Sequence, residues 1–453
     1  MPRMFRRNFH ERMPARLARM FEKRGVGDLK VDLWNAFVDS GLVGITDHDC
    51  SALPRILPLS YLPVIRRAAR DITECLMKIL SLPERELRAV LPGGPVASYL
   101  IEELGVLRHR PRRLTGSMRF DMAIVGEPGP DNPPVLMEVN EIGFDGIGRS
   151  SFIQQSLLRL FPGLAPRVRC LDTAAAEVRN MRRLGPKLSR FHYDSYTWEE
   201  ESILMRAGRA GLTIRISQPP AFRAPIDEDC KLMQRERVRV EKGRLVVGDF
   251  APSSYMVAYS FELKDYKEAP DFFRMLIRCK TPQYSPFITG LVAPKTILVI
   301  LSDRSLTGRL IGPARARRLS NSVLRASLLP GREEEVIRRP EGLVLKHADG
   351  MGGERVFVGR EAARQVKKIR PRDAAHWVVQ DRIDINTMDI DGFLSRPRRV
   401  IADLGVYVQY DWNGREFLNF DVGGFITRAT NRSLKVNVSG GGCQVPVMFD
   451  KSR

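Results

Sequence analysis

Two short apolar segments carry charged or amide side chains at alternating positions, and this pattern limits how the chain can fold. The segments are RFDMAIV, residues 119–125, and PVLMEVNEIGFDGIG, residues 134–148. Successive side chains of a strand point to opposite faces of a sheet. Arg119 and Asp121 therefore share one face of the first predicted strand, and Leu136, Glu138 and Asn140 share one face of the second.

The link between the two segments, GEPGPDNPP, is rich in turn-forming residues and predicts a β-hairpin. If the polar faces of the two strands coincide, Asp121, Glu138 and Asn140 converge, with Arg119 beside them. Two carboxylates and an amide offer hard oxygen ligands, which suit Mg²⁺. An amphipathic hairpin with its polar face in water explains the same pattern, and on this stretch alone the two interpretations weigh about equally.

The composition excludes several classes of protein. The chain has 453 residues, of which 43% are hydrophobic, so it can bury a large core and is not a disordered protein. No segment approaches the roughly 18 uncharged apolar residues of a membrane span, and we expect no membrane partner. The six cysteines are scattered without CxxC pairs, which indicates reduced thiols in the cytoplasm and gives no zinc signature.

The formal net charge is +20, much of it from arginine clusters. The clusters are RHRPRR at 108–113, ARARR at 314–318 and RPRR at 396–399. Binding of nucleic acid or of another acidic partner is one interpretation. We favour a basic solvated surface, because no aromatic residues interleave with the basic ones and no nucleic-acid-binding motif accompanies them.

Periodicity and turn signals predict five regions along the chain. They are a basic N-terminal arm over 1–27, a mainly helical segment over 28–115, the hairpin and a helix over 116–164, an α/β subdomain over 165–290, and a strand-rich region over 291–453. Alternating strands and helices over 165–290 are typical of a parallel sheet. In the last region we expect an apolar strand over 295–303 and a mobile basic insert or small subdomain over 304–340.

A second pattern is a strand, a lysine, a glycine-rich loop and a strand in LVLKHADGMGGERVFVG, residues 343–359. The glycines Gly350, Gly352 and Gly353 would let backbone N–H groups approach phosphate oxygens, and Lys346 would add a point charge. The loop lacks the GK[ST] sequence of a Walker loop. A glycine-rich hairpin turn is the alternative, and for the loop taken alone it is the favoured one.

The order of the motifs resembles that of the circularly permuted ATP-grasp enzymes, most closely the glutathionylspermidine-synthase-like synthetases. It runs RFD, ExN, an α/β region, the lysine of APKTILV, the lysine with its glycine-rich loop, WVVQD and GGFITR, from about residue 55 to about 447. In ordinary ATP-grasp enzymes the ExN strand follows the lysines, whereas here Asn140 precedes Lys346. The resemblance implies a permuted ATP-grasp fold of mixed α/β type, with a helical N-terminal segment and a pre-ATP-grasp-like α/β subdomain.

The resemblance also implies roles for matching residues. Those that would hold two Mg²⁺ ions are Asp121, Glu138 and Asn140. Those that would contact ATP are Lys295, Lys346, Gly350, Gly352, Gly353, Val379 and Gln380. Arg119 would meet the carboxylate or acyl-phosphate end of the substrate. A late catalytic arginine matches Arg428, with Arg415 as the rival.

The implied activity is that of an ATP-dependent carboxylate–amine ligase. A carboxylate takes the γ-phosphoryl group of ATP, and an amine attacks the acyl phosphate to give an amide, with ADP and phosphate released. The expected substrates are a small peptide, an amino acid or a polyamine. A ligase that modifies a peptide or protein tail is the alternative, in which the basic surface holds an acidic partner. A third reading, from another class, is a nucleotide-binding or nucleic-acid-binding protein without turnover.

Overall fold

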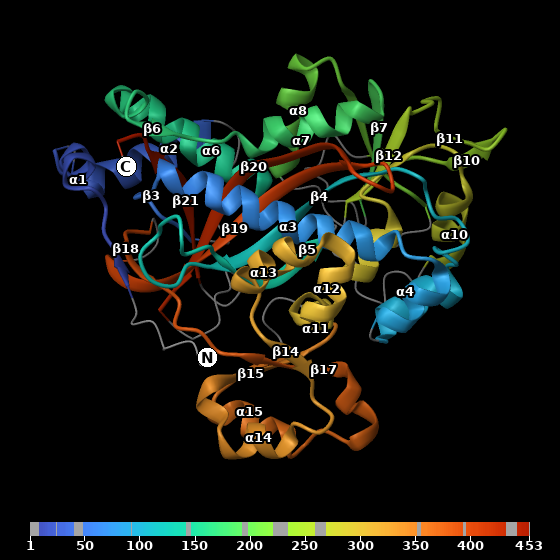
Figure 1. Cartoon of the computed structure of the whole chain (residues 1–453). Coiled ribbons are helices and arrows are strands. Elements are labelled where there is room, and N and C mark those ends of the chain that lie inside the picture. The colour runs from blue at the N-terminus through green and yellow to red at the C-terminus, as the bar shows by residue number, and fades with distance from the viewer. Residues whose placement is uncertain are drawn as a thin grey trace.

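The computed structural model describes residues 9–23, 25–39, 49–91, 93–141, 146–192, 198–220, 234–258, 269–350, 355–392, 396–431 and 442–452. Figure 1 shows a large body built on a central sheet, with helices on both sides of it. A smaller unit, made of residues between 326 and 381, lies at one end of this body. No helix within the described residues has the length and apolar character needed to cross a bilayer.

The large body is built on a mixed sheet of 15 strands. Its main path runs in the order β2 (Asp49–Cys50), β21 (Cys443–Asp450), β20 (Phe417–Thr430), β19 (Arg398–Trp412), β4 (Leu114–Ala123), β13 (Gln283–Tyr284), β12 (Ser254–Ala258), β7 (Lys187–His192), β8 (Thr213–Gln218) and β9 (Gln234–Arg235). The strands that branch from this path are β5 (Val135–Glu141) beside β4, β18 (Thr387–Ile390) beside β19, β1 (His10–Glu11) beside β18, and β3 (Arg55–Pro58) and β6 (Val168–Arg169) beside β21.

The sheet joins an antiparallel half to a parallel half. Strands β21, β20, β19, β4 and β5 pair antiparallel with one another, whereas β13, β12, β7, β8 and β9 pair in parallel with one another. The parallel half comes from residues 187–284, which confirms the α/β texture expected there. The chain therefore has a mixed α/β architecture with one large sheet.

The smaller unit is a four-stranded antiparallel sheet with two short helices. Its strands lie in the order β14 (Ala326–Leu328), β17 (Trp377–Asp381), β15 (Leu343–His347) and β16 (Val356–Val358). The helices are α14 (Glu333–Arg338) and α15 (Arg360–Val366). The unit has its own apolar cluster, in which Val336, Leu345 and Ala362 are fully buried. A separate two-stranded hairpin is formed by β10 (Val238–Glu241) and β11 (Arg244–Val247).

The remaining α-helices of the described residues lie outside the smaller unit. They are α1 (Ala15–Glu22), α2 (Val26–Asp39), α3 (Leu62–Leu80), α4 (Glu84–Val90), α5 (Pro95–Ser98), α6 (Ile147–Leu160), α7 (Thr173–Met181), α8 (Trp198–Arg209), α10 (Pro270–Arg278), α11 (Ile297–Ser302), α12 (Arg304–Ile311) and α13 (Pro313–Ser322). Within the N-terminal arm, α1 is anchored by Leu17 and Phe21, which are buried in an apolar cluster. The arm is therefore packed onto the body rather than loose from residue 9 onward.

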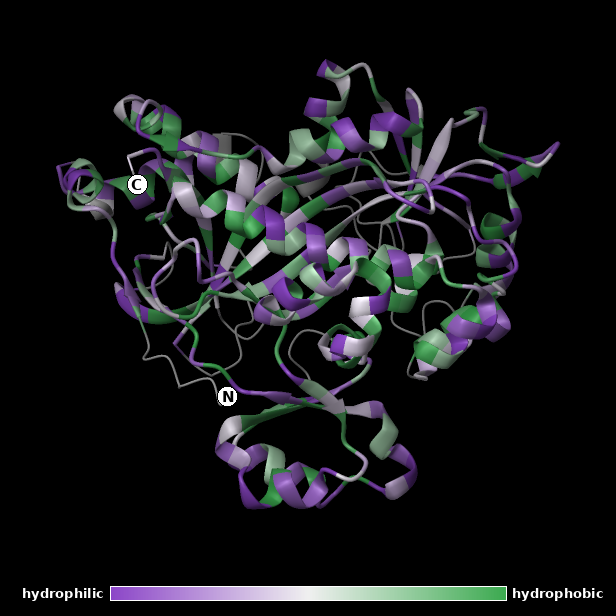
Figure 2. Cartoon of the chain, viewed as in Figure 1, coloured by the Kyte–Doolittle hydropathy of each residue, from purple (hydrophilic) through white to green (hydrophobic). Residues whose placement is uncertain are grey.

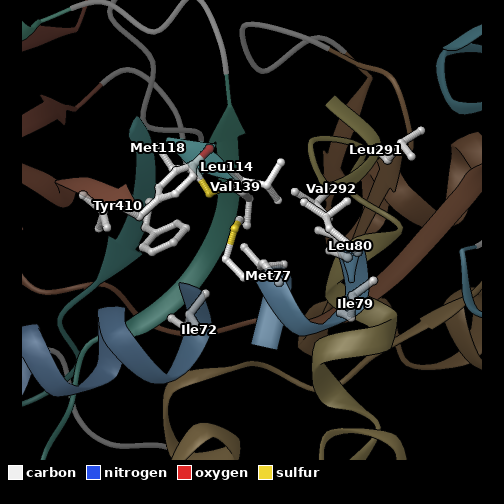
Figure 3. Packing of buried hydrophobic residues seen from close by; sticks show 14 of the residues in the cluster. Ile72, Met77, Ile79, Leu80, Leu114, Met118, Val139, Leu291, Val292 and Tyr410 are labelled. Atoms are coloured by element: carbon white, nitrogen blue, oxygen red, sulfur yellow. The ribbon is translucent and has the colours of Figure 1, made fainter. Parts of the chain in front are cut away.

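Helix α3 crosses the sheet and supplies much of the main core. Its apolar residues recur at three- and four-residue spacings, and Figure 2 shows hydrophobic and hydrophilic residues interleaved along it. Figure 3 shows Met77 of α3 near Met118 and Val139, and Leu80 of α3 beside Val292. Burial of each such side chain contributes about 1.5–3 kcal/mol, so α3 fixes the face of the sheet that it covers.

In the last region, one predicted element is wrong and another is right only in part. Residues 295–303 form no strand, because the apolar run ILVILS is the short helix α11 and Asp303 begins the next helix by capping its backbone N–H groups. Residues 304–340 are no mobile insert, since α12 and α13 pack on α3. The small-subdomain alternative holds only for their second part, because β14 and α14 belong to the smaller unit. Arg315 and Arg318 of α13 form ion pairs with carboxylates of α3.

A buried carboxyl group lies between α7 and the sheet. Glu177 on α7 is fully buried and accepts hydrogen bonds from Ser117 Oγ at 2.8 Å and from Gln409 Nε2 at 3.2 Å. Burial raises the pKa of Glu177 above its usual value, because the loss of water around the charged form outweighs these hydrogen bonds and the charge of Arg190.

We expect Glu177→Gln to remove a pH-dependent loss of stability. The pKa of Glu177 is higher in the folded protein than in the unfolded chain. The wild type therefore loses stability as the pH rises from the unfolded-state pKa to the folded-state pKa, and the loss is up to ~1.4 kcal/mol per pH unit. A glutamine at position 177 does not titrate, so this loss disappears. Oε1 of Gln409 has no hydrogen-bond partner among the described residues, and after a rotation of the Gln409 amide group it can accept a hydrogen bond from the new glutamine. Urea titrations should show similar stabilities in acid and a more stable variant above neutral pH; parallel pH curves would contradict the assignment.

Candidate functional site

The β4–β5 hairpin brings the predicted polar residues onto one face. Arg119 lies opposite Asn140 and Asp121 lies opposite Glu138, while Phe120 lies opposite Val139 on the buried face. Asn140 Nδ2 donates a hydrogen bond to Asp121 Oδ2 at 2.8 Å. The polar faces of the two strands therefore coincide, and they do not simply face water, because Asp121 is only 1% exposed.

A β-bulge at Met137 corrects one detail of the predicted strand. The register shifts after the Asp121–Glu138 pair, so that Met122 lies opposite Leu136 and Met137 is the extra residue of β5. Leu136 is consequently buried in the main core, on the face opposite Glu138 and not on the same face as predicted. The bulge also frees the carbonyl group of Met137 from the ladder.

Two arginines hold the carboxylate of Asp121. Arg119 Nε donates to Asp121 Oδ1 at 2.8 Å, and Arg428 Nη2 lies 2.7 Å from Asp121 Oδ2. Burial alone would raise the pKa of Asp121, but the two guanidinium groups offset it and hold that pKa below its usual value. Asp121 is thus an anion in the folded protein. Arg428 is the late arginine that the structure brings to the site, whereas Arg415 is exposed in the turn between β19 and β20.

Arg428 is itself held by Asp403 on β19. Its backbone N–H donates to Asp403 Oδ1 at 2.8 Å, and its Nε donates to Asp403 Oδ2 at 2.8 Å. Asp403 is fully buried, and burial raises its pKa against the opposing effect of Arg428. The sequence analysis did not single out Asp403, although one carboxylate inside the apolar run VIADLGVYV was a usable signal.

Lys295 reaches the hairpin from the segment before α11. Its Nζ lies 2.7 Å from Glu138 Oε1 and also donates to the carbonyl oxygen of Gly350. Its backbone N–H donates to the carbonyl oxygen of Ala348 at 2.9 Å, which ties this segment to the end of β15. The lysine is 5% exposed, so one buried cation joins the oxygen donors of β5 to the start of the glycine-rich loop.

Lys346 reaches the same hairpin from β15. Its Nζ donates to the carbonyl oxygen of Met137, the bulge residue, at 3.0 Å. Burial lowers the pKa of Lys346 to about 8, with Glu138 acting in the opposite direction and Lys295 in the same direction. A buried ammonium group with a carbonyl contact and a second cation nearby is a suitable place for an anionic ligand.

The other predicted ATP contacts are distributed differently. Gly352 and Gly353 lie outside the described residues, and Gly350 is buried at the edge of the loop. Val379 is buried in the core of the small unit, on β17 between β14 and β15, so its side chain does not join the site. Gln380, next along β17, is 2% exposed, and its Nε2 has no hydrogen-bond partner among the described residues.

Asp349 is a second site residue that sequence reasoning missed. It lies between Lys346 and the glycines, and both of its carboxylate oxygens are buried without a hydrogen-bond partner in the described part of the chain. Burial raises its pKa, although the charges of His376 and Lys295 act against this. The usable signal was a carboxylate directly before a glycine-rich loop.

The residues present fit a magnesium nucleotide. Asp121, Glu138 and Asn140 place three oxygen-bearing side chains on one face of β4 and β5, the donor type that Mg²⁺ binds. Among the described residues, no three His, Cys, Asp or Glu side chains form a group that could hold a metal ion. The two buried lysines and the unpaired Nε2 of Gln380 are donors that a phosphate chain and a purine base can use.

Comparisons with known proteins bear on the fold. No profile of a known protein family matches the sequence, and no curated protein matches it. A solved structure of a glutathione-synthetase-like effector from Globodera pallida, in the apo form, is 11% identical, with a TM-score of 0.67 over 93% of this chain and 96% of that chain. The chain shares the fold of that protein over nearly its whole length.

A second solved structure is more distant. A putative gamma-glutamylcysteine synthetase from Methylobacillus flagellatus is 13% identical, with a TM-score of 0.40 over 77% of this chain and 85% of that chain. This score is too low to bear on the fold.

Proposed function

We propose that the chain is an ATP-dependent ligase of the circularly permuted ATP-grasp type, which joins a carboxylate to an amine. The observation that carries the proposal is the meeting of Asp121, Glu138 and Asn140 with two buried lysines, Lys295 and Lys346, from later segments. The early position of β4 and β5 in the chain, before both lysines, supports the permuted order. The glutathione-synthetase-like name of the Globodera protein agrees with a ligase.

ATP and Mg²⁺, when bound, supply the phosphoryl group and the charge neutralisation that its transfer requires. Asp121, Glu138 and Asn140 would hold the metal, which we propose to be two ions. Lys295 and Lys346 would hold phosphate oxygens. The loop that contains Gly350, Gly352 and Gly353 would cover the phosphates and exclude water, because an acyl phosphate hydrolyses readily.

Arg119 and Arg428 would orient the substrate carboxylate. Guanidinium groups bind carboxylates through paired N–H donors, and both arginines already bind a carboxylate, that of Asp121. The same donors suit the negative oxygens of an acyl phosphate. In this role the arginines act on the substrate end of the site and the lysines on the nucleotide end.

The direct test is ADP release in a matrix of acids and amines. Amino acids, short peptides and polyamines would be tested in pairs, including the precursors of glutathione, with each compound alone as the control. We expect ADP release that needs both an acid and an amine, and an amide product in mass spectrometry. ADP release that is absent from all pairs, or independent of the amine, would refute the amide-forming proposal.

The basic surface favours one alternative. With a net charge of +20, the chain could hold an acidic peptide or protein tail as the acid or the amine. Turnover with acidic peptides that falls steeply with salt would favour this ligase, because surface charges are screened. Binding of ATP without any turnover would favour the third candidate, a non-catalytic nucleotide-binding protein.

We expect Arg119→Lys to lower kcat/KM for the carboxylate by roughly 10-fold while affinity for an ATP analogue stays within about twofold. Lysine keeps the charge but loses the paired donors. The matched control is Arg113→Lys, since Arg113 also binds a carboxylate, that of Asp411, but lies outside the site. Loss of ATP-analogue affinity in Arg119→Lys would instead place Arg119 on the nucleotide side.

A further inference from the structure

A third arginine lies buried behind the site. Arg55 on β3 is 1% exposed, and its guanidinium group is fully engaged. Nε and Nη2 donate to the two carboxylate oxygens of Glu11 at 2.7 and 2.6 Å. Nη1 donates to the carbonyl oxygen of Asp403 at 2.5 Å and to Thr427 Oγ1 at 3.1 Å. Arg55 therefore holds the residue that binds Arg428 and also the residue just before Arg428.

Glu11 comes from the N-terminal arm. It lies on β1, which pairs in parallel with β18, and its side chain is 8% exposed. Asn386 Nδ2 adds a hydrogen bond to Glu11 Oε1 at 2.9 Å. The arm thus supplies the carboxylate that neutralises Arg55. Arg55 in turn binds the backbone carbonyl oxygen of Asp403, whose carboxylate pairs with Arg428, and Arg428 pairs with Asp121.

We propose that Glu11 and Arg55 are positioning residues for Arg428, so that Glu11 of the N-terminal arm supports the site. This inference rests on the proposed function, because it assigns support residues to the same site. An unpaired buried arginine is unfavourable and seeks another anion. Without Glu11, the guanidinium group of Arg55 would reorient and disturb its hydrogen bond to the backbone carbonyl oxygen of Asp403. Arg428, which Asp403 holds, would then lose the orientation that places its Nη2 on Asp121.

The kinetic test compares two variants of the same strand. Glu11→Gln should lower kcat by about 10-fold, as losses of orienting contacts behind a site commonly do, with affinity for an ATP analogue unchanged. His10→Ala is the matched control, since His10 bonds Thr387 and Asp389 and does not touch Arg55, and it should keep wild-type kcat. Arg428→Lys should also cost less in the Glu11→Gln background than in the wild type.

A double-variant comparison of stability tests the coupling between Glu11 and Arg428 without measuring activity. Glu11 and Arg428 share no contact in the structure, so their effects on the urea midpoint should add unless Arg55 and Asp403 couple them. We expect the midpoint shift of the double variant Glu11→Gln, Arg428→Lys to be smaller than the sum of the single shifts, whereas His10→Ala with Arg428→Lys should be additive. Additive shifts for Glu11→Gln, or a wild-type kcat, would overturn the inference. If the wild type releases no ADP with any acid and amine, the proposed function fails, but the stability comparison still shows whether Glu11 and Arg428 are coupled.

Discussion

Asp121→Asn is expected to lower the rate of ADP release by about 100-fold or more while the protein remains folded. The substitution keeps the shape of the side chain and removes one of the two carboxylates proposed to hold Mg²⁺. It also removes the anion that Arg119 and Arg428 share, so some stability is lost with it. The rate must therefore be measured at a temperature at which circular dichroism shows the variant to be folded.

A second buried carboxylate of the same sheet provides the control for Asp121→Asn. Asp411 on β19 is fully buried and binds Arg113 with both oxygens, at 2.6 and 2.5 Å. Asp411→Asn should lose stability in the same way but keep its turnover. Near-wild-type ADP release in folded Asp121→Asn, or an equal loss of rate in Asp411→Asn, would reject the β4–β5 hairpin as the metal site.

The hairpin itself was predictable from local pattern. Strand alternation put Arg119 and Asp121 on one face and Glu138 and Asn140 on another, but it left open whether the two faces meet; the structure pairs Asp121 with Glu138 and Arg119 with Asn140. The bulge at Met137 was not predictable, because an extra residue leaves no mark in an alternating pattern. It moved Leu136 to the core and gave Lys346 its carbonyl contact, so the missed detail is part of the site.

The meeting of distant segments was beyond local pattern. Lys346 and Met137 are 209 positions apart, and only the order of motifs in a resembling family suggested that Lys346 and the hairpin belong to one site. The same limit explains the wrong strand over 295–303, since a short apolar run fits a buried helix equally well. It also explains the helices in 304–340, where Arg315 and Arg318 find carboxylates of α3 far away in the sequence.

Lys346→Met should weaken binding of a non-hydrolysable ATP analogue by about 1–3 kcal/mol, or roughly 5- to 150-fold, without destabilising the protein. Burial already disfavours the charged form of Lys346, whose pKa is about 8, so an apolar side chain of similar length should leave the midpoint of thermal unfolding unchanged or raised. Lys295→Met should weaken binding as well but also lower stability, because it leaves Glu138 without its ion pair. Lys78→Met is the control, since Lys78 also donates to a backbone carbonyl, that of Arg415, away from the site. Calorimetry with the analogue is the measurement. Unchanged affinity in both site variants would mean that residues 343–359 form only a hairpin turn. Lost affinity together with retained stability in Lys346→Met would mean that the buried charge of Lys346 serves to bind a ligand.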